Sequence, residues 1–276
     1  MKLTVLVDNT TNTRDLKAEA GFSLYIEDQS TNILFDTGCS ALFLENAHKL
    51  GIDLSKAEYI VLSHGHYDHT WGLKHLLTMY QSVNTVVPTV KPILLTHPLS
   101  FNQRTRDSKE MGCNIAESEL IDFFSIHKSK NPVWITDKLV FLGEIERNFS
   151  YEGNHTIGQI IKNGIATPDS MEDDTALAYK SSQGLVIITG CSHSGICNIV
   201  EQAKQICQDE RVLGIIGGFH LRKPPIKQLS GTIDYLQQAN VQQLYACHCT
   251  DQPSRIALAQ LGNLHETTVG LTIEYN

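Results

Sequence analysis

Four potential metal ligands lie within six residues of one another, in the segment His64-Gly65-His66-Tyr67-Asp68-His69. The apolar run directly before this segment predicts a buried strand that ends where the ligands begin. His64 and His66 are two residues apart, so in an extended backbone both imidazoles project to one side and can hold one metal ion. Gly65 between them leaves room for a turn. The pattern indicates a metal site.

Asp68 and His69 are neighbours that do not easily join the same tetrahedral shell as the first pair, but they can serve a second ion nearby. Two ions about 3.5–4 Å apart clamp a bridging water and lower its pKa, which gives a hydroxide nucleophile. Imidazole and carboxylate ligands together suit zinc, manganese or iron. We therefore predict two divalent metal ions, with zinc the first choice. The alternative, a polar turn without metal, would leave a costly uncompensated cluster of buried imidazoles.

Three more histidines follow predicted strands, namely His193, His220 and His248. The paired glycines before His220 permit a close backbone approach to a ligand, so His220 can bind substrate, act as a general acid or bind metal. A packing role for these glycines is the alternative. Cys247 and Cys249 flank His248, and alternation along a strand would point them away from it, which predicts packing roles.

Short apolar runs rich in β-branched residues predict the elements that position these side chains. Strands are expected at 3–7, 23–26, 32–35, 59–62, 93–95, 139–142, 176–179, 185–189, 212–216, 243–246 and 268–273, and helices at 42–50, 196–207 and 233–239. Strands and helices that alternate in the C-terminal half favour βαβ-like layering, whereas the N-terminal half is typical of hairpins. The fold class expected is a mixed α/β sandwich. The least regular stretch, 98–173, is interpreted as a lid or as an idle surface insertion.

Composition excludes several classes of protein. The chain has 276 residues, 41% of them hydrophobic and 19% charged, which is typical of a folded globular protein. A net charge of −8 without a basic run argues against nucleic acid or an anionic membrane as partner, so a small-molecule substrate is expected. Seven cysteines without a CxxC pair indicate neither a disulfide framework nor a zinc ribbon. The opening apolar run is too brief for a signal peptide, which predicts a cytoplasmic protein.

His64, His66, Asp68 and His69 match the signature HxHxDH, and through it the chain resembles the metallo-β-lactamase superfamily. The resemblance implies a single αββα domain over residues 1–276, with two mixed sheets flanked by helices. It also implies that Asp36 supports residues 64–69, which we call the metal loop, without binding metal itself. His193 would complete the shell of the ion held by His64 and His66, and His248 would complete that of the ion held by Asp68 and His69.

One position departs from the common pattern of that superfamily. The strand end that usually carries a bridging carboxylate has the sequence Thr189-Gly190-Cys191. Cys191 can ligate there as a thiolate, or His193 can take that place while His155 fills the third-histidine position. His193 is the preferred ligand.

The whole chain is similar to one branch of the superfamily, the dihydropterin ribofuranosylaminobenzene 5′-phosphate synthase-like proteins. Several segments carry this resemblance: 34–38, 50–54, 63–69, 190–195 together with Asn198, and 217–221. Trp71 stands where a glycine usually follows the metal loop, and Ala20 where a histidine often follows Glu19. We therefore expect its substrate contacts to differ from those of that branch.

These observations predict a dinuclear metal-dependent hydrolase that acts on a small ester, phosphodiester or pyrophosphate through a metal-bridging hydroxide. Asp68 and His220 are the candidate catalytic residues, the latter as an acid or a substrate contact. The resemblance implies a first alternative, a transferase that releases pyrophosphate from a phosphorylated, pterin-like substrate. A non-catalytic metal- or ligand-binding sensor is the second alternative.

Overall fold

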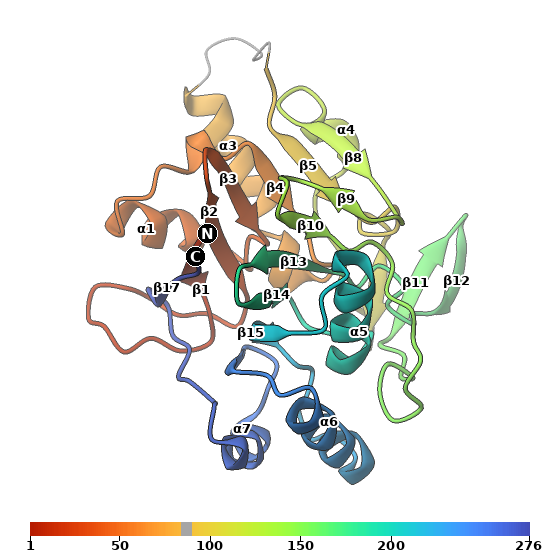
Figure 1. Cartoon of the computed structure of the whole chain (residues 1–276). Coiled ribbons are helices and arrows are strands. Elements are labelled where there is room, and N and C mark those ends of the chain that lie inside the picture. The colour runs from red at the N-terminus through yellow and green to blue at the C-terminus, as the bar shows by residue number, and fades with distance from the viewer. Residues whose placement is uncertain (84–89) are drawn as a thin grey trace. The chain divides into compact units, whose positions relative to one another are not determined.

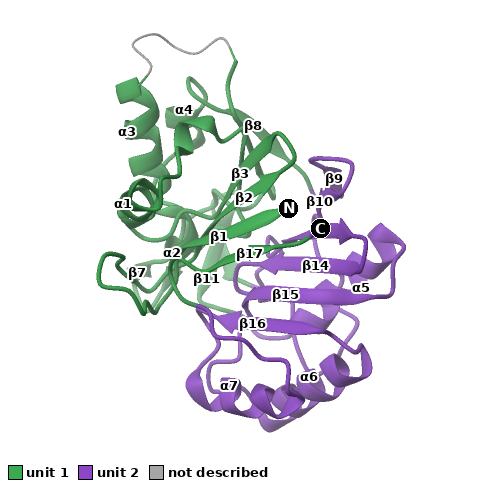
Figure 2. Cartoon of the chain, turned by 60° about the vertical axis from the view of Figure 1, so that its left-hand side comes forward, with its two compact units in different colours: residues 1–129, 156–169, 268–275 green, residues 130–155, 170–267, 276 purple. Residues whose placement is uncertain are grey.

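The computed structural model describes residues 1–83 and 90–276, which divide into two compact units (Figure 2). Unit 1 contains residues 1–129, 156–169 and 268–275, and unit 2 contains residues 130–155, 170–267 and 276. Each unit has a large mixed sheet of its own with helices packed against it (Figure 1). The predicted mixed α/β class is confirmed.

Among the described residues, the large sheet of unit 1 has seven strands, antiparallel at one side and parallel at the other. Antiparallel pairing joins the hairpin strands that come first in the chain. The later strands pair in parallel, which requires longer crossover connections. The strands are, in spatial order, β17 (Thr272–Glu274), β1 (Lys2–Val7), β2 (Ser23–Asp28), β3 (Thr31–Phe35), β4 (Tyr59–Val61), β5 (Ile93–Thr96) and β8 (Ser125–Lys128).

The crossovers of unit 1 carry its helices, which cover a continuous apolar core. Phe43 and Ala47 lie four residues apart on one face of α1 and are buried against strand residues such as Leu34 and Ile60. Leu73 of α3 joins the same core. The helical segments are α1 (Leu42–Lys49), the 3₁₀ turn η1 (Leu54–Lys56), α2 (Tyr67–Thr70), α3 (Leu73–Val83) and α4 (Glu117–Leu120).

A second, smaller sheet of unit 1 lies within the stretch predicted to be irregular. It is antiparallel, with the order β12 (Ile165–Pro168), β11 (Gln159–Lys162), β6 (Arg104–Arg106) and β7 (Lys109–Glu110). These strands have two to four residues, and many of their side chains are exposed and polar. Such short strands have no hydrophobic alternation to reveal them in the sequence.

In the part of the chain that the structure describes, the sheet of unit 2 has six strands, and three of them are parallel neighbours. The order is β16 (Gln243–Cys247), β15 (Val212–Gly218), β14 (Gly184–Thr189), β13 (Ala176–Ser181), β10 (Leu139–Phe141) and β9 (Val133–Trp134). Pairing is parallel from β14 to β16 and antiparallel elsewhere. Apolar residues of the helices and strands form one core. The helical segments are α5 (Ile196–Cys207), α6 (Ile226–Gln238), α7 (Gln252–Leu258) and η2 (Ala259–Leu261).

Each of the eleven predicted strands overlaps a strand of the structure, and the three predicted helices overlap α1, α5 and α6. Among the residues that the structure describes, no helix is long and apolar enough to cross a bilayer. That residues 1–276 form one domain stays a prediction.

We predict that Ile187→Ala destabilises the protein by about 2–5 kcal/mol, because this fully buried side chain of β14 leaves a cavity in the core of unit 2. Ile256→Ala serves as the matched control, since the Ile256 side chain on α7 is 62% exposed and its loss costs about 0.5 kcal/mol or less. Urea unfolding of both variants measures the difference. Equal midpoints for the two variants would contradict the packing described for β14.

Candidate metal centre

The metal loop of unit 1 begins where β4 ends. His66 is the N-cap of the single-turn helix α2, so the chain turns from extended to helical in the middle of the motif. His64 Nε2 lies 3.2 Å from His66 Nδ1. Two nitrogens that share one tetrahedral zinc are about 3.3 Å apart, given Zn–N bonds of about 2.0–2.1 Å. The pair therefore fits one metal ion.

Asp36 holds the metal loop from the turn after β3. Its Oδ1 accepts a hydrogen bond from Ser63 N (2.7 Å), and its Oδ2 accepts from Ser63 Oγ (2.7 Å) and His69 Nδ1 (2.6 Å). Asp36 and His69 are fully buried. Because the proton of His69 is thereby held on Nδ1, the lone pair of Nε2 is available to a metal.

The Ser63 hydroxyl extends this orientation to His64. Since Ser63 Oγ donates to Asp36, its contact of 2.9 Å with His64 Nδ1 is one in which the ring donates. His64 then also presents Nε2 to a metal. Asp68 lies beside His69, with Asp68 Oδ1 3.9 Å from His69 Nε2, and this pair fits a second ion.

Gly65 is required because the metal loop rests directly on neighbouring backbone and side-chain atoms. A Cβ atom at Gly65 would lie 2.2 Å from both Arg104 Nη1 and the Ser100 carbonyl oxygen. Arg104 is buried, and its Nε donates to Asp169 Oδ2 at 2.8 Å. This buried ion pair therefore forms part of the floor beneath the metal loop.

In unit 2, β14, β15 and β16 are parallel neighbours (Figure 2), and residues with metal-binding side chains follow their carboxyl ends. Cys191 and His193 follow β14, His220 follows β15, and His248 follows β16. Ser192, His220 and His248 have positive φ angles of 59°, 49° and 50°. Each loop thus turns sharply where its strand ends, which keeps its side chains at the edge of the sheet.

Three imidazoles of unit 2 form a cluster. The rings of His155 and His220 are stacked with centroids 4.7 Å apart, and those of His193 and His220 lie 4.3 Å apart. One ring nitrogen from each of the three lies within 4.8 Å of the others. Burial, His220 and Arg147 lower the pKa of His155 to about 4, so its ring is neutral at neutral pH. The cluster has the donor chemistry of a metal site.

The loop that carries His193 is fixed by two buried carboxyl groups. Asp174 Oδ2 accepts hydrogen bonds from Ser194 N and Oγ, and Glu152 Oε1 accepts one from Asn198 N at the start of α5. Burial raises the pKa of Asp174 to about 6 and that of Glu152 to about 7. Asn198, one of the residues that carried the sequence resemblance, also binds Ser194 O through Nδ2.

Cys249 does not follow the predicted strand alternation, because β16 ends at Cys247 and His248 adopts a left-handed conformation. Its thiol lies against the two other loops: Cys249 Sγ donates to the Cys191 carbonyl oxygen (3.4 Å) and accepts from His220 N (3.3 Å). Burial disfavours the thiolate, but hydrogen bonds with Cys191 and His220 and the charge of His248 outweigh it. The pKa of Cys249 is therefore well below that of an ordinary thiol.

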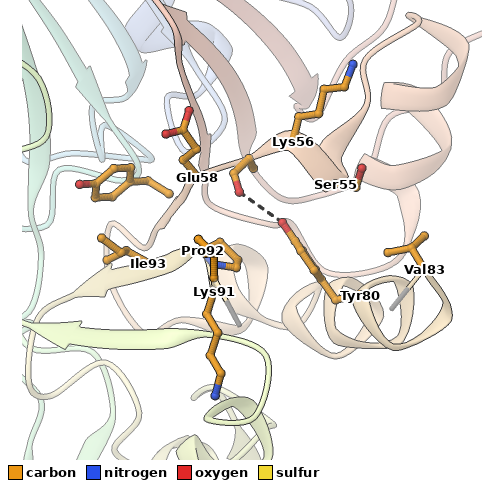
Figure 3. A pocket seen from close by; sticks show the side chains of 11 residues that line it. Ser55, Lys56, Glu58, Tyr80, Val83, Lys91, Pro92 and Ile93 are labelled. Atoms are coloured by element: carbon orange, nitrogen blue, oxygen red, sulfur yellow. Dashed lines mark hydrogen bonds between the residues drawn. The ribbon is translucent and has the colours of Figure 1, made fainter. Parts of the chain in front are cut away.

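A hollow of 580 Å³ in unit 1 lies at the other ends of the strands (Figure 3). Tyr59 and Ile93, the first residues of β4 and β5, line it together with Lys56, Lys91 and Tyr80. The metal loop follows the carboxyl end of β4, so this hollow and the metal loop are at opposite ends of one strand. None of the predicted site residues lines the hollow.

The predicted site residues are divided between the two units. Unit 1 contains His64, His66, Asp68, His69 and Asp36, and unit 2 contains His155, Cys191, His193, His220 and His248. Sequence reasoning did not identify the supporting residues Ser63, Arg104, Asp169, Asp174 and Glu152. Ser63 has a usable signal, its position directly before the motif, whereas the others are buried polar residues that no local pattern distinguishes.

Comparison with known proteins identifies the class. A family model described as the metallo-β-lactamase superfamily matches residues 16–160, and the chain belongs to this superfamily. It is 31% identical over 249 residues to the 7,8-dihydropterin-6-methyl-4-(β-D-ribofuranosyl)-aminobenzene-5′-phosphate synthase of Methanocaldococcus jannaschii, covering 84% of this chain and 81% of that protein. An uncharacterized protein of the same organism is 31% identical over 98% of both chains.

Solved structures agree with this assignment. Tm1679, described as a metal-dependent hydrolase of the β-lactamase superfamily, superposes with a TM-score of 0.84 at 28% identity, covering 99% of this chain and 98% of that one. A diphosphatase of the PhnP family shares the fold, with a TM-score of 0.58 at 16% identity and coverage of 100% and 98%. The predicted metallo-β-lactamase fold is confirmed, and so is the resemblance to the synthase branch.

We predict that Asp36→Asn weakens zinc binding by about 10–100-fold while the fold is retained. An asparagine tolerates the positive φ of 57° at this position, but its amide has one acceptor oxygen where Asp36 uses two, Oδ1 for Ser63 N and Oδ2 for Ser63 Oγ and His69 Nδ1. Whichever way the amide is turned, its NH2 group faces an N–H donor, of Ser63 or of His69, so the orientation of the metal loop is weakened. Competition with a chromophoric chelator measures the affinity, and Asp53→Asn, at an exposed N-cap of η1, is the control. Unchanged affinity in Asp36→Asn would contradict the orienting role.

Proposed function

We propose that this protein is a dinuclear metal-dependent hydrolase of a small ester, phosphodiester or pyrophosphate. One observation carries the proposal: His64 Nε2 and His66 Nδ1 converge at 3.2 Å, while Asp36 orients His69 so that its Nε2 also faces outward for a metal. A polar turn that binds no metal does not require the protonated nitrogen of each imidazole to be fixed in this way. Membership of a superfamily of metal-dependent hydrolases supports the same reading.

In this proposal His64, His66 and His193 hold one ion, and Asp68, His69 and His248 hold the other. Zinc is the preferred metal because imidazole dominates the donor set, with manganese or iron as alternatives. Two bound divalent ions supply an activated water and stabilise negative charge that develops on the substrate. Cys191 remains the alternative ligand where the superfamily commonly has a bridging carboxylate.

The protein side chains then orient the reaction. Asp36 and Ser63 hold two imidazoles in the tautomers that leave Nε2 available, and Asp174 fixes the loop of His193 through Ser194. His220, whose ring centroid lies 4.3 Å from that of His193, is the proposed acid or substrate contact. The proposed partner is a small molecule in the cytoplasm. The net charge of −8 disfavours polymeric nucleic acid.

A transferase is the second candidate, because the synthase of Methanocaldococcus jannaschii matches most of the chain at 31% identity. In a transferase an organic nucleophile takes the place of water at the same metals, and pyrophosphate leaves. The two reactions differ in one measurable respect: the transferase releases pyrophosphate only when a second substrate is present.

We expect purified protein to contain two metal ions per chain and to hydrolyse at least one of a bis-aryl phosphodiester, an aryl ester and a lactone once zinc, manganese or iron is restored. His66→Ala should lose metal, and its turnover should fall by more than the roughly 10–100-fold that loss of an outer hydrogen-bond partner costs. His75→Ala, which removes an exposed imidazole of α3, is the matched control.

Full turnover with metal retained in His66→Ala would overturn the assignment. Two metals with no hydrolysis of any of these substrates would favour the transferase, if pyrophosphate release then depends on a second substrate. The same result would favour a binding module if the protein binds a ligand without turning it over.

A further inference from the structure

Helix α6 of unit 2 carries two stripes of residues on different faces. The stripe that packs into the core of unit 2 is buried and has a spacing of four residues: Gln228, Thr232 and Leu236. The second stripe has spacings of four, three and four residues: Ile226, Ser230, Ile233 and Gln237. Such spacings are typical of a helix face that packs against another helix. Ile226, at the start of this second stripe, is 87% exposed.

An apolar hollow lies beside the second stripe. Helices α6 and α7 lie side by side (Figure 2), and residues of both line a hollow of 380 Å³. Its walls are mostly apolar, with Pro224, Leu229 and Ile233 on one side and Pro253 on the other. Ile226 stands at its rim and projects into solvent. Exposed apolar surface that gathers in one place marks a site of contact with another molecule.

We propose that this surface, made of the second stripe of α6 and the hollow beside it, binds the same surface of a second copy of the chain, with the two α6 helices antiparallel. An interface around a twofold axis must be complementary to itself, because each patch contacts its own copy. A projecting Ile226 next to a hollow meets this requirement, since Ile226 of each copy can fill the hollow of the other. The short side chain of Ser230, in the middle of α6, lets the helices approach closely where they cross.

The charges beside the second stripe match in the same arrangement. Lys227 and Asp234 are exposed, and each directly follows an isoleucine of the stripe, so they flank it on one side. They are seven residues apart, which is two helical turns or about 10.5 Å along the axis. When two α6 helices cross antiparallel near Ser230, Lys227 lies opposite Asp234 of the partner subunit, and this pair occurs twice. The opposed helix dipoles favour the same arrangement. Charge complementarity therefore favours a second copy as the occupant.

Size-exclusion chromatography with light scattering tests the proposal on the full-length protein. The wild-type mass should rise with concentration toward twice that of one chain, with a micromolar dissociation constant, because a single helix pair is a small interface. Ile226→Asp should weaken association about 100-fold or more, since it places an unpaired carboxylate in the apolar hollow of the partner. Ile165→Asp is the matched control, because Ile165 is 66% exposed on β12 of unit 1, and it should associate as the wild type does. These masses do not depend on the proposed function.

Charge reversal tests the antiparallel arrangement. Lys227→Asp and Asp234→Lys each place two like-charged pairs in the interface, so each alone should weaken association about 10-fold. The variant with both changes restores two opposite-charged pairs and should regain the wild-type dissociation constant.

The proposal is overturned if the wild type keeps the mass of one chain up to about 100 µM, which excludes a micromolar dimer. It is also overturned if Ile226→Asp dimerises like the wild type, or if the double charge reversal is no tighter than the single ones. A wild-type monomer that binds an apolar fluorescent dye, and loses the dye in Ile226→Asp, would assign the hollow to a small ligand instead of a second copy.

Discussion

The buried carboxylate of Asp36 is the interaction on which the metal loop of this protein depends. It sits in the turn after β3 and receives three hydrogen bonds from the segment that follows the neighbouring strand β4. A buried carboxylate is costly unless all its partners are present, so its position and theirs are determined together. The parallel pairing of β3 with β4 therefore has a chemical consequence, because it decides which nitrogen of His64 and His69 carries a proton.

In both units the candidate site residues follow the carboxyl ends of strands. In unit 1 the metal loop follows the carboxyl end of β4, and in unit 2 the clustered histidines and cysteines follow the carboxyl ends of β14, β15 and β16. In parallel sheets the loops at this edge lie close together, so short segments far apart in sequence can share one site. Asp36, His220 and His248, which turn the chain after their strands, adopt positive φ angles. The resulting backbone strain is offset by the packing of the sheet around them.

The strands and the metal motif could be predicted from the sequence because each has a local signal: a β-branched apolar run, or four ligands within six residues. The supporting residues could not. Arg104 and Asp169 are 65 positions apart, and Glu152 and Asn198 are 46 apart. No local sequence pattern can predict hydrogen bonds between residues so far apart in the chain. Cys249 was misplaced for a different reason, since the strand rule fails when the backbone turns at His248.

The path of the chain also constrains how unit 1 is assembled. Its seven-stranded sheet pairs β1, near the start of the chain, with β17, made from residues 272–274, and its small sheet includes β11 and β12 from residues 159–168. During synthesis one edge of β1 therefore stays unpaired until β17 is made, which happens only after the whole of the unit 2 sheet. Long-range strand pairing of this kind slows folding and leaves an edge open to wrong partners. β1 precedes every other strand of its sheet in sequence, yet it is among the last of them to gain its full set of neighbours.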